Sequence, residues 1–500
     1  MNNRWFASPA ADLIHPTHLT NSMNTNPNVT QGVLWLTLLF LCSPPLRSEQ
    51  FGLFTYQVVD GTTVTITEYP KDATGPLEIP AEITGKPVTG IGFQAFSGCT
   101  GLSNVTIPSS VTSIQPMAFF GCTGLTSIYV EPENPKYASI EGVLFNELRT
   151  HLIKYPEAKA GAYTLPSSVT NIDDDAFSGC TELTNITLSS SLSRIGAASF
   201  WDCTLLTSVT LPASLTTIDF NFSGYSNISS INVEPANPKY ASSGGVLFNK
   251  TQTQLIEYPG GKSGAYALPP GVTSIGSNAF QGCAKLTNIT YSSSITSIAN
   301  AAFYDCTGLT TVTIPSSILS IGDFAFEGCT GLTKAIFLDN APSMSISVFT
   351  INDPGFTLYY LSSRTGFASP TWLGYPTTII NETTYPAASW LLEHGLWYDT
   401  ALQADPDGDG VNLFMAYALD LDPTVPQRSQ MPVPVLNANT LSLSFHGSSP
   451  RITYRAETSI DMTNWTTTGV TQSAPGPDGR STASVPLDAP SRFLRIAVDD

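Results

Sequence analysis

Residues 314–332 read IPSSILSIGDFAFEGCTGL, and variants of this phrase recur along most of the chain. Each copy places a Cys three residues after a Phe, as Cys329 follows Phe326. The repeat length of 23 residues separates Cys283 from Cys306, and Cys306 from Cys329. Self-similarity at a fixed short period predicts a solenoid, because one unit is too small to bury its own apolar face. We therefore expect a stack of coils whose functional residues lie on its surface.

Each unit begins with the pattern L-x-x-[IVA]-x-[ILVFY], whose alternation predicts a short strand with one face turned inward. A proline such as Pro315 often follows and ends the strand, since proline cannot donate to a ladder of hydrogen bonds. An apolar pair such as Val272 and Ile275 begins the return path, and an Ala-Phe pair fills the interior. The predicted fold class is mainly β, a solenoid of 23-residue coils.

A larger duplication overlies the short repeat. Residues 130–146 (VEPENPKYASIEGVLFN) recur as residues 233–249 (VEPANPKYASSGGVLFN), 103 positions further on. The copies continue through an apolar pair and Tyr-Pro, at residues 152–156 and 255–259. GVLFN, a mainly polar stretch and this ending predict a β-hairpin that replaces an ordinary coil, and we expect both hairpins to project from the same side of the stack. A third hairpin is predicted over residues 54–69, with Asp60-Gly61 at its turn. It is expected to cap the apolar edge of the first coil.

The repeats resemble leucine-rich repeats of the BspA-like bacterial surface type. The resemblance rests on residues 107–125, 268–286 and 314–332, and it covers roughly residues 76–338. The unit around residues 222–225 departs from the pattern, because it is one residue short and has Tyr in place of Cys. The resemblance implies a leucine-rich repeat solenoid with a role in adhesion or in binding host proteins.

The cysteines of the repeat are expected to be reduced. Equivalent positions in successive coils face the same interior beside a Phe, where a free Cys behaves as a small buried hydrophobe. Occasional disulfides between neighbouring coils are the alternative, since export favours oxidation.

Charge excludes one class of partner. Charged residues make up 12% of the chain, and 39 acidic residues oppose 21 basic ones, for a net charge of −18. Binding to nucleic acid needs clustered Lys and Arg, and the sequence has no such cluster. We therefore expect no nucleic-acid partner, and the same balance disfavours an anionic membrane surface.

Export is predicted from residues 33–42 (VLWLTLLFLC), a ten-residue apolar run. This length is typical of the core of a signal peptide and is too short for a spanning helix, which needs about 20 apolar residues. We expect cleavage near Ser48, a secreted or cell-surface protein and no transmembrane segment after cleavage. A buried N-terminal strand is the alternative.

The C-terminal third contains a candidate calcium loop between two predicted helices, over residues 388–398 and 411–421. Carboxylates at loop positions 1, 3 and 5, with Gly410 at position 6, match the start of an EF-hand-type loop, where hard oxygens converge on a hard cation. The predicted Ca²⁺ ligands are Asp405, Asp407, Asp409 and the carbonyl of Val411.

Position 12 of the loop is Ala416 and not the usual bidentate Glu. The loss weakens calcium affinity unless Asp420 or Asp422 reaches back to the loop. The alternative is an Asp/Gly-rich turn that caps the following helix. Residues after 430 alternate again and predict a small β-sandwich. The C-terminal part contains WLLEHGLWYD (390–399) and DPDGDGVNLFMAYALDLDP (405–423), followed by TYRAETSIDMTNWTTTGV (453–470). These phrases resemble C-terminal modules on exported proteins of some environmental bacteria, which implies secretion or surface retention.

The predicted domain organisation follows from these segments. It consists of a signal-peptide region (1–48), an N-terminal β-hairpin cap (49–75), the leucine-rich repeat solenoid (76–338), a C-terminal cap (339–380), a helical segment with the calcium-type loop (386–424) and a small β-sandwich (430–500).

The sequence contains no nucleophile, zinc or phosphate-loop motif, so we expect no enzymatic activity. Asp173-Asp174-Asp175 is a carboxylate cluster, but it lies at the position of ordinary turns in other coils. We interpret it as a solvated turn.

The candidate ligand surface lies between the inward residues of each strand. Its members are Thr106, Tyr129, Thr187, Thr210, Asn232, Thr290 and Thr313, with Ile336 next in the series. Solenoids use such surfaces for extended recognition, and the predicted function is non-catalytic binding of protein or glycan at the cell surface. The alternatives are an extracellular enzyme acting on polysaccharide or peptide, and a purely structural spacer. Threonine also simply suits an exposed strand.

Overall fold

The computed structural model describes residues 48–219, 227–350, 352–409, 411–427, 430–437, 439–488 and 492–499. The predicted export segment, the shorter unit at 222–225 and Gly410 lie outside the described residues.

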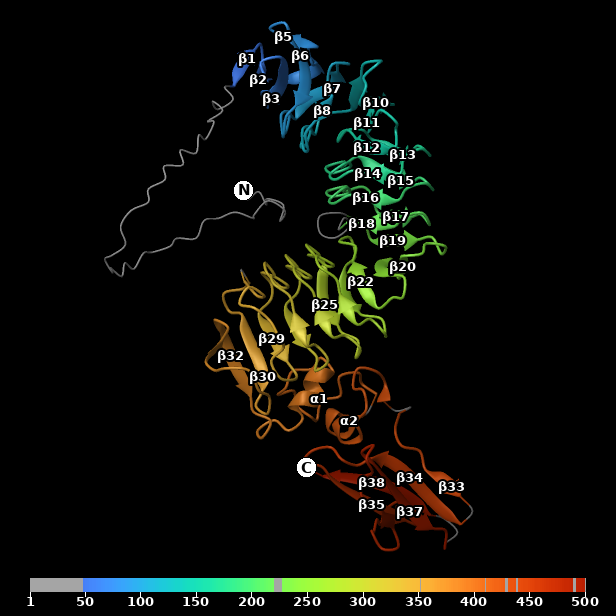
Figure 1. The fold of residues 1–500 in the computed structure, drawn as a ribbon. Helices are drawn as coiled ribbons and strands as arrows, with labels where there is room; N and C mark the ends of the chain where they lie inside the picture. Colours follow the sequence, from blue (N-terminus) through green and yellow to red (C-terminus); the bar gives the residue numbers. More distant parts are fainter. Residues whose placement is uncertain are drawn as a thin grey trace, which may run out of the picture. The chain divides into compact units, whose positions relative to one another are not determined.

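Each coil contributes strands to two series along the stack, which we call the first and second ladders (Figure 1). The first ladder contains the longer strands β4 (Thr74–Glu78), β7 (Gly101–Ile107), β9 (Ser127–Val130), β13 (Gly161–Thr164), β15 (Leu183–Thr187), β17 (Ser208–Leu211), β19 (Ser230–Val233), β23 (Gly264–Ala267), β25 (Leu286–Thr290), β27 (Thr311–Ile314) and β29 (Lys334–Phe337). The second contains β6 (Lys86–Ile91) and the two-residue strands β8 (Ser113–Ile114), β14 (Asn171–Ile172), β16 (Arg194–Ile195), β18 (Thr217–Ile218), β24 (Ser274–Ile275), β26 (Ser297–Ile298) and β28 (Ser320–Ile321). Each ladder is divided into separate hydrogen-bonded sheets, such as β4-β7-β9 and β13-β15 in the first. The predicted mainly β solenoid is confirmed.

Stacked phenylalanines form the centre of the core. The ring of Phe303 lies 4.7 Å from that of Phe280 and 4.9 Å from that of Phe326, and all three are fully buried. The backbone N–H of Phe303 donates to the carbonyl of Ala325 in the next coil, at 2.7 Å. The same residue therefore joins coils through its side chain and its backbone.

The repeated cysteines also connect neighbouring coils. The thiol of Cys306 donates to the carbonyl of Phe280 one coil earlier, at 3.0 Å, and that of Cys329 donates to Phe303, at 3.1 Å. Burial raises the pKa of Cys203 to about 12, so this thiol keeps its proton. The seven cysteines of the described residues are all buried and form no disulfide. Cysteine suits this position because its side chain is small and apolar enough to be buried, and because its thiol is a weak donor that can reach the carbonyl of the preceding coil.

The hairpins are part of the second ladder, and the prediction that they project from the stack is wrong. Their strand pairs are β2 (Phe54–Val59) with β3 (Thr63–Glu68), β11 (Val143–Asn146) with β12 (His151–Lys154), and β21 (Val246–Asn249) with β22 (Gln254–Glu257). In each, the second strand pairs in parallel with the next strand of the second ladder, as β12 does with β14. Val143, Leu144 and Phe145 are fully buried, so exposure of this hairpin would cost hydrophobic free energy. β10 (Tyr137–Ile140) and β20 (Tyr240–Ser243) pair with β11 and β21.

A Tyr-Pro pair after each hairpin begins a new stack of rings. Tyr155 lies 5.1 Å from Phe177, and Tyr258 lies 4.8 Å from Phe280, so each tyrosine takes the place of a coil phenylalanine. Tyr69 lies 5.6 Å from Phe96 in the same way. We call each hairpin with the coils that follow it a block. The three blocks have separate core clusters, within residues 56–144, 143–247 and 246–360.

A buried ion pair joins the first block to the second. The Lys154 ammonium lies 3.1 Å from the Glu157 carboxylate, and their side chains are 9% and 2% exposed. Glu157 also accepts a hydrogen bond from the backbone N–H of Gly121, at 2.8 Å, at the end of the first block. In the second copy of the duplication, Glu257 and Gly260 occupy the two positions, so this junction is particular to the first copy.

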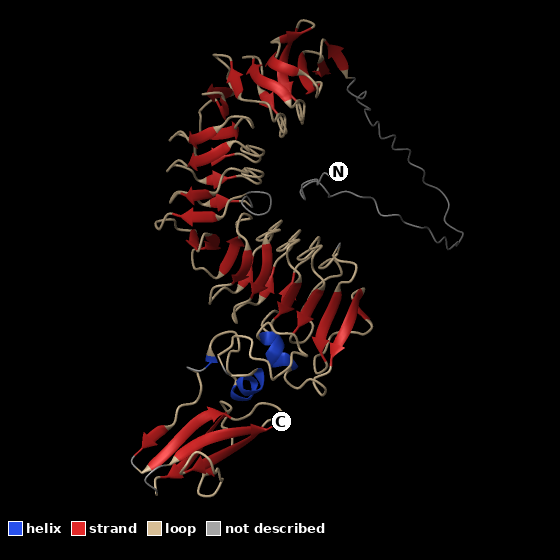
Figure 2. Ribbon diagram, turned by 180° about the vertical axis from the view of Figure 1, so that it is seen from behind, coloured by secondary structure: helices blue, strands red, loops and turns tan. Residues whose placement is uncertain are grey.

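The C-terminal part closes the first ladder and adds two short helices. β30 (Thr357–Leu361) and β32 (Tyr375–Ile380) continue the ladder beyond β29, and β31 (Thr371–Trp372) pairs with β32. Helices α1 (Ala388–Glu393) and α2 (Leu413–Leu419) follow (Figure 2). α1 is shorter than predicted, because Gly395 adopts a positive φ of 73° just after its end. No helix in the described ranges is long and apolar enough to cross a membrane.

The remaining strands form the two ends of the described chain. At the N-terminal end, β1 (Glu49–Phe51) pairs with β2, and β5 (Glu82–Ile83) pairs with β6. At the C-terminal end, one sheet has the order β33 (Val435–Asn437), β34 (Thr440–His446), β37 (Arg480–Pro486), β36 (Thr471–Gln472), and β35 (Thr453–Ser459) pairs with β38 (Phe493–Asp499).

The phenylalanine stack makes a first prediction. Phe303→Ala should lower the free energy of unfolding by about 3–5 kcal/mol, because it leaves a cavity between two stacked rings. Phe324→Ala is the matched control, since Phe324 is 47% exposed, and it should change stability by less than about 1 kcal/mol. Urea unfolding measures both variants. Equal losses of stability in the two variants would show that the phenylalanine stack does not dominate the stability of the core.

Candidate functional site

The candidate ligand surface consists of two outward columns on the first ladder. The predicted column is Thr106, Tyr129, Thr187, Thr210, Asn232, Thr290 and Thr313, and the second column is Asn104, Ser127, Asn185, Ser208, Ser230, Asn288 and Thr311. We call these residues the strand face. Register places Thr106 opposite Tyr129, and Thr210 opposite Asn232. Thr106 and Thr313 are half-buried, whereas the other residues of the predicted column are exposed.

The strand face has no charged side chain, although the chain carries a net charge of −18. Glu78 pairs with Thr106 at one end of the face, and Lys334 pairs with Thr311 at the other. Between them, β13 and β23 add the exposed methyl groups of Ala162, Ala265 and Ala267. The rest of the surface offers hydroxyl and amide groups and one large aromatic ring, Tyr129, which is 49% exposed. Such groups donate and accept hydrogen bonds without attracting ions.

The expectation that Ile336 continues the exposed series is wrong. Ile336 is 3% exposed, because it packs in one apolar cluster with Ala388 and Leu392 of α1. The ammonium of Lys334 lies 4.0 Å from the centre of the Trp397 ring, a cation–π contact that holds the same segment against the ladder. The strand face therefore ends at β27.

The Asp173-Asp174-Asp175 cluster is more than a solvated turn. Asp173 lies 3.1 Å from His151, and Arg194 bridges Asp174, at 3.0 Å, and Asp219, at 3.1 Å. Burial raises the pKa of Asp173 and holds that of Asp175 at about 6.

The same carboxylates line a pocket of about 320 Å³ at the junction between the first and second blocks. Met117 and Phe120 form part of its apolar wall. The sequence does not predict this pocket, since the hairpin of β11 and β12 separates along the chain the coils that the fold brings together.

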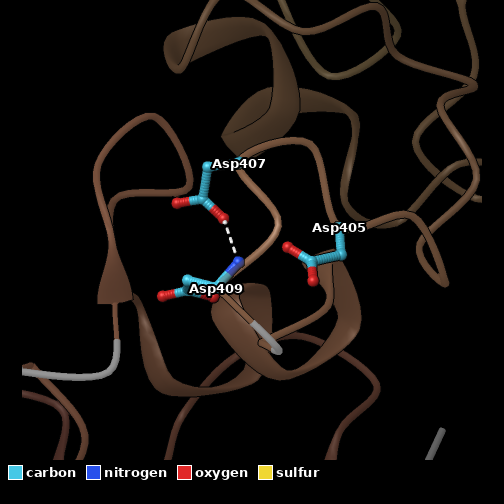
Figure 3. Close-up of side chains that lie close together, drawn as sticks. All are labelled: Asp405, Asp407 and Asp409. Carbon is cyan, nitrogen blue, oxygen red and sulfur yellow. Dashed lines mark hydrogen bonds between the residues drawn. The ribbon is translucent and has the colours of Figure 1, made fainter.

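The candidate calcium loop brings its three carboxylates together. Asp405, Asp407 and Asp409 each offer an oxygen within 4.8 Å of the others (Figure 3). The backbone N–H of Gly408 donates to Asp405, at 3.0 Å, and that of Val411 donates to Asp409, at 2.8 Å, so the turn itself holds the side chains inward. Desolvation, followed by the charges of Asp409 and Asp405, raises the pKa of Asp407. An all-oxygen, acidic donor set fits Ca²⁺.

Neither carboxylate proposed to replace the twelfth ligand belongs to this group. Ala416 is fully buried in α2, Asp420 lies 4.0 Å from His446, and Asp422 accepts a hydrogen bond from Thr424, at 2.9 Å. Instead, Gln427 lies against the loop, with its side-chain Nε2 3.3 Å from Asp407 Oδ2. Its backbone N–H also donates to Asp409 Oδ2. A glutamine 18 residues beyond Asp409 gives no signal in a single sequence.

The repeat geometry agrees with a known family. A family model described as "BspA type Leucine rich repeat region" matches six copies, over residues 81–157, 155–264 and 262–353, which is more than half of the chain. The protein is therefore a leucine-rich repeat protein. Within that class, the chain belongs to the BspA type family, as the repeats predicted. This family is defined by its repeat and not by a reaction.

Several solved structures are similar to the chain. A leucine rich cell surface protein from Faecalibacterium prausnitzii has 24% identity and a TM-score of 0.44, with 72% of this chain and 100% of that chain covered. The pneumococcal vaccine antigen PcpA has 23% identity and a TM-score of 0.40, with 63% and 94% covered. A leucine-rich repeat protein from Eubacterium ventriosum has 24% identity and a TM-score of 0.37, with 51% and 64% covered. Comparison with curated proteins gave no match.

The raised pKa of Asp175 makes a second prediction. The unfolded chain ionises this carboxyl at lower pH than the folded chain, so stability present below the ordinary value of 3.8 is lost as the pH rises through about 6. We expect Asp175→Asn to raise the free energy of unfolding at pH 7 by about 1–2 kcal/mol, which is less than the full shift because solvent screens a partly exposed group. The difference in free energy of unfolding between Asp175→Asn and the wild type should decrease toward zero as the pH falls to about 4.

Urea unfolding at several pH values measures this difference. Asn278→Asp is the matched control, because Asn278 occupies the equivalent coil position with a φ of 58° against 56° for Asp175. It should destabilise with the same pH dependence. A gain that does not vary with pH would contradict the assignment to ionisation.

Proposed function

We propose that this protein is a non-catalytic repeat scaffold that is secreted or displayed at the cell surface and binds protein or glycan ligands through the strand face. The observation that carries the proposal is the uncharged polar character of that face within an acidic chain. Surfaces that bind charged partners carry the opposite charge, so this face is suited to a neutral partner. Membership of a BspA type family supports a place at the cell surface.

Tyr129 is the anchor that we propose for this contact. Exposed aromatic side chains dominate binding free energy at interfaces because they bury a large area at little entropic cost. Tyr129 is half exposed and is flanked by Ser127 and Thr106, which supply polar groups beside its ring. Its backbone lies in a sheet, so the ring is presented from a rigid support.

Binding arrays test the proposal. The purified chain is screened against glycans, matrix proteins and cell-wall fragments, and each ligand found is titrated against variants. Tyr129→Ala and Thr187→Glu should each weaken binding about tenfold or more, since one removes the anchor and the other adds a charge to a neutral face. Thr217→Glu is the control, because it adds the same charge at an exposed threonine of the second ladder.

Two outcomes would favour the alternatives. Turnover of a polysaccharide or peptide that is lost on substitution of one polar residue would favour an extracellular enzyme. A chain that binds nothing on any array would favour a structural spacer.

We also propose that Asp405, Asp407, Asp409 and the carbonyl of Val411 hold Ca²⁺. Calcium titration of the full chain by calorimetry should show one site that Asp407→Asn weakens about tenfold or more, because the site loses one charged ligand. Bound calcium should also raise the melting temperature by mass action. Asp72→Asn is the control at an exposed acid outside the loop. If millimolar calcium produces no binding heat and no shift in melting temperature, calcium is removed from the proposal.

A further inference from the structure

We propose that the side-chain oxygen Oε1 of Gln427 is a ligand of the cation held by Asp405, Asp407 and Asp409, and that it replaces the ligand missing at loop position 12. This inference rests on the calcium site proposed above. It adds a residue from outside the loop, 18 positions beyond Asp409, that the EF-hand pattern does not contain.

Gln427 is a buried polar residue with an unmet acceptor. The residue is 1% exposed, and Oε1 is buried without a hydrogen bond from any described residue. Buried carbonyl oxygens are nearly always paired, since burial removes the water that would otherwise donate to them. An unpaired one beside carboxylates indicates that a further group completes the site.

The orientation of the Gln427 amide is fixed. Its Nε2 donates to the carbonyls of Asp422 and Val425, each at 3.0 Å. Rotation of the amide by a half turn would set Oε1 against these two carbonyl oxygens, which offer no proton. Oε1 therefore stays on the other side of the amide, where only a donor or a cation can satisfy it.

The position of the amide relative to the carboxylates is also fixed. Nε2 lies 3.3 Å from Asp407 Oδ2, and the backbone N–H of Gln427 donates to Asp409 Oδ2. Because Oε1 and Nε2 are bonded to the same carbon of one planar amide, Oε1 lies within a few ångströms of Asp407 Oδ2. Amide oxygens are ordinary calcium ligands, and they suit a hard cation as carboxylates do.

The lining of the loop leaves this role open. Ala416 offers no ligand, and Asp420 and Asp422 have other partners. A cation held by three carboxylates and one backbone carbonyl falls short of the six to eight oxygens that Ca²⁺ takes, and a neutral amide adds one without adding repulsion among the acids.

Two measurements on the full chain test the inference. Calcium calorimetry compares wild type with Gln427→Met, which keeps the side-chain length and removes both polar atoms. We expect calcium affinity to fall about tenfold or more. Gln430→Met, three residues further on at an exposed position, should leave affinity unchanged. The second measurement follows the side-chain carbonyl ¹³Cδ signal of Gln427, assigned by its loss in Gln427→Met, as calcium is added to glutamine-labelled protein.

The outcomes separate this inference from the proposal beneath it. A wild-type chain that binds no calcium would overturn both. Wild-type binding with unchanged affinity in Gln427→Met would overturn this inference and leave the loop site in place. A third outcome is that Gln427→Met binds calcium more weakly while the ¹³Cδ signal of Gln427 in the wild-type chain does not move with calcium. That outcome would assign Gln427 to hydrogen bonding of Asp407 and would also overturn this inference. Weakened binding together with a calcium-dependent ¹³Cδ shift is the result expected.

Discussion

The hydrogen bond from one coil to the next is the constraint on which this structure depends. Within each block, the backbone N–H of a core phenylalanine donates to the following coil, as Phe280 does to Ala302, at 2.7 Å; the other such donors are Phe96, Phe177, Phe303 and Phe326. The bond sets the coil spacing, and that spacing brings the rings of Phe280 and Phe303 within stacking distance. It leaves the carbonyl of Phe280 facing the interior, where the Cys306 thiol donates to it. The Phe-x-x-Cys pattern thus follows from one backbone geometry.

Where the series of hydrogen bonds between coils is interrupted, side chains pair with the backbone groups that are left. At the end of the first block, the N–H of Gly121 has no ordinary coil to meet, and the carboxylate of Glu157 accepts it. Lys154 then neutralises the buried carboxylate and donates to the carbonyl of Ser178. Removal of one partner alone would leave a buried charge without compensation, which is more costly than the absence of both. The second junction, with Gly260 in place of Glu157, has neither partner of this pair.

The sequence predicts features that repeat and misses those that depend on contacts between distant segments. The strands, prolines and Ala-Phe-x-Gly-Cys phrases recur in register, so the solenoid and the family follow from them. The burial of the hairpins does not, because an isolated GVLFN strand gives no sign of which neighbour covers it. The end of the strand face at β27 and the position of Gln427 could not be predicted either. Ile336 contacts α1, and Gln427 contacts Asp407, only in the folded chain. A group of carboxylates within one loop, such as Asp405 to Asp409, can be predicted from the sequence because the residues are close along the chain.

The hairpins divide the strand face into segments of similar chemistry. The backbone N–H of Ile128 donates to the carbonyl of Gly142 in the turn between β10 and β11, and that of Ile231 donates to the carbonyl of Gly245 in the turn between β20 and β21, both at 2.8 Å. Both glycines have a positive φ, and a Cβ at Gly142 would lie 2.9 Å from the side chain of Ser127, so only glycine allows this approach. The first two segments thus end at the same kind of contact. Weak binding at one short segment gains strength when the next segment binds a linked part of the same ligand, because the second event is intramolecular. For the binding function proposed above, a segmented neutral face would be better matched to a partner that itself repeats than to one compact epitope.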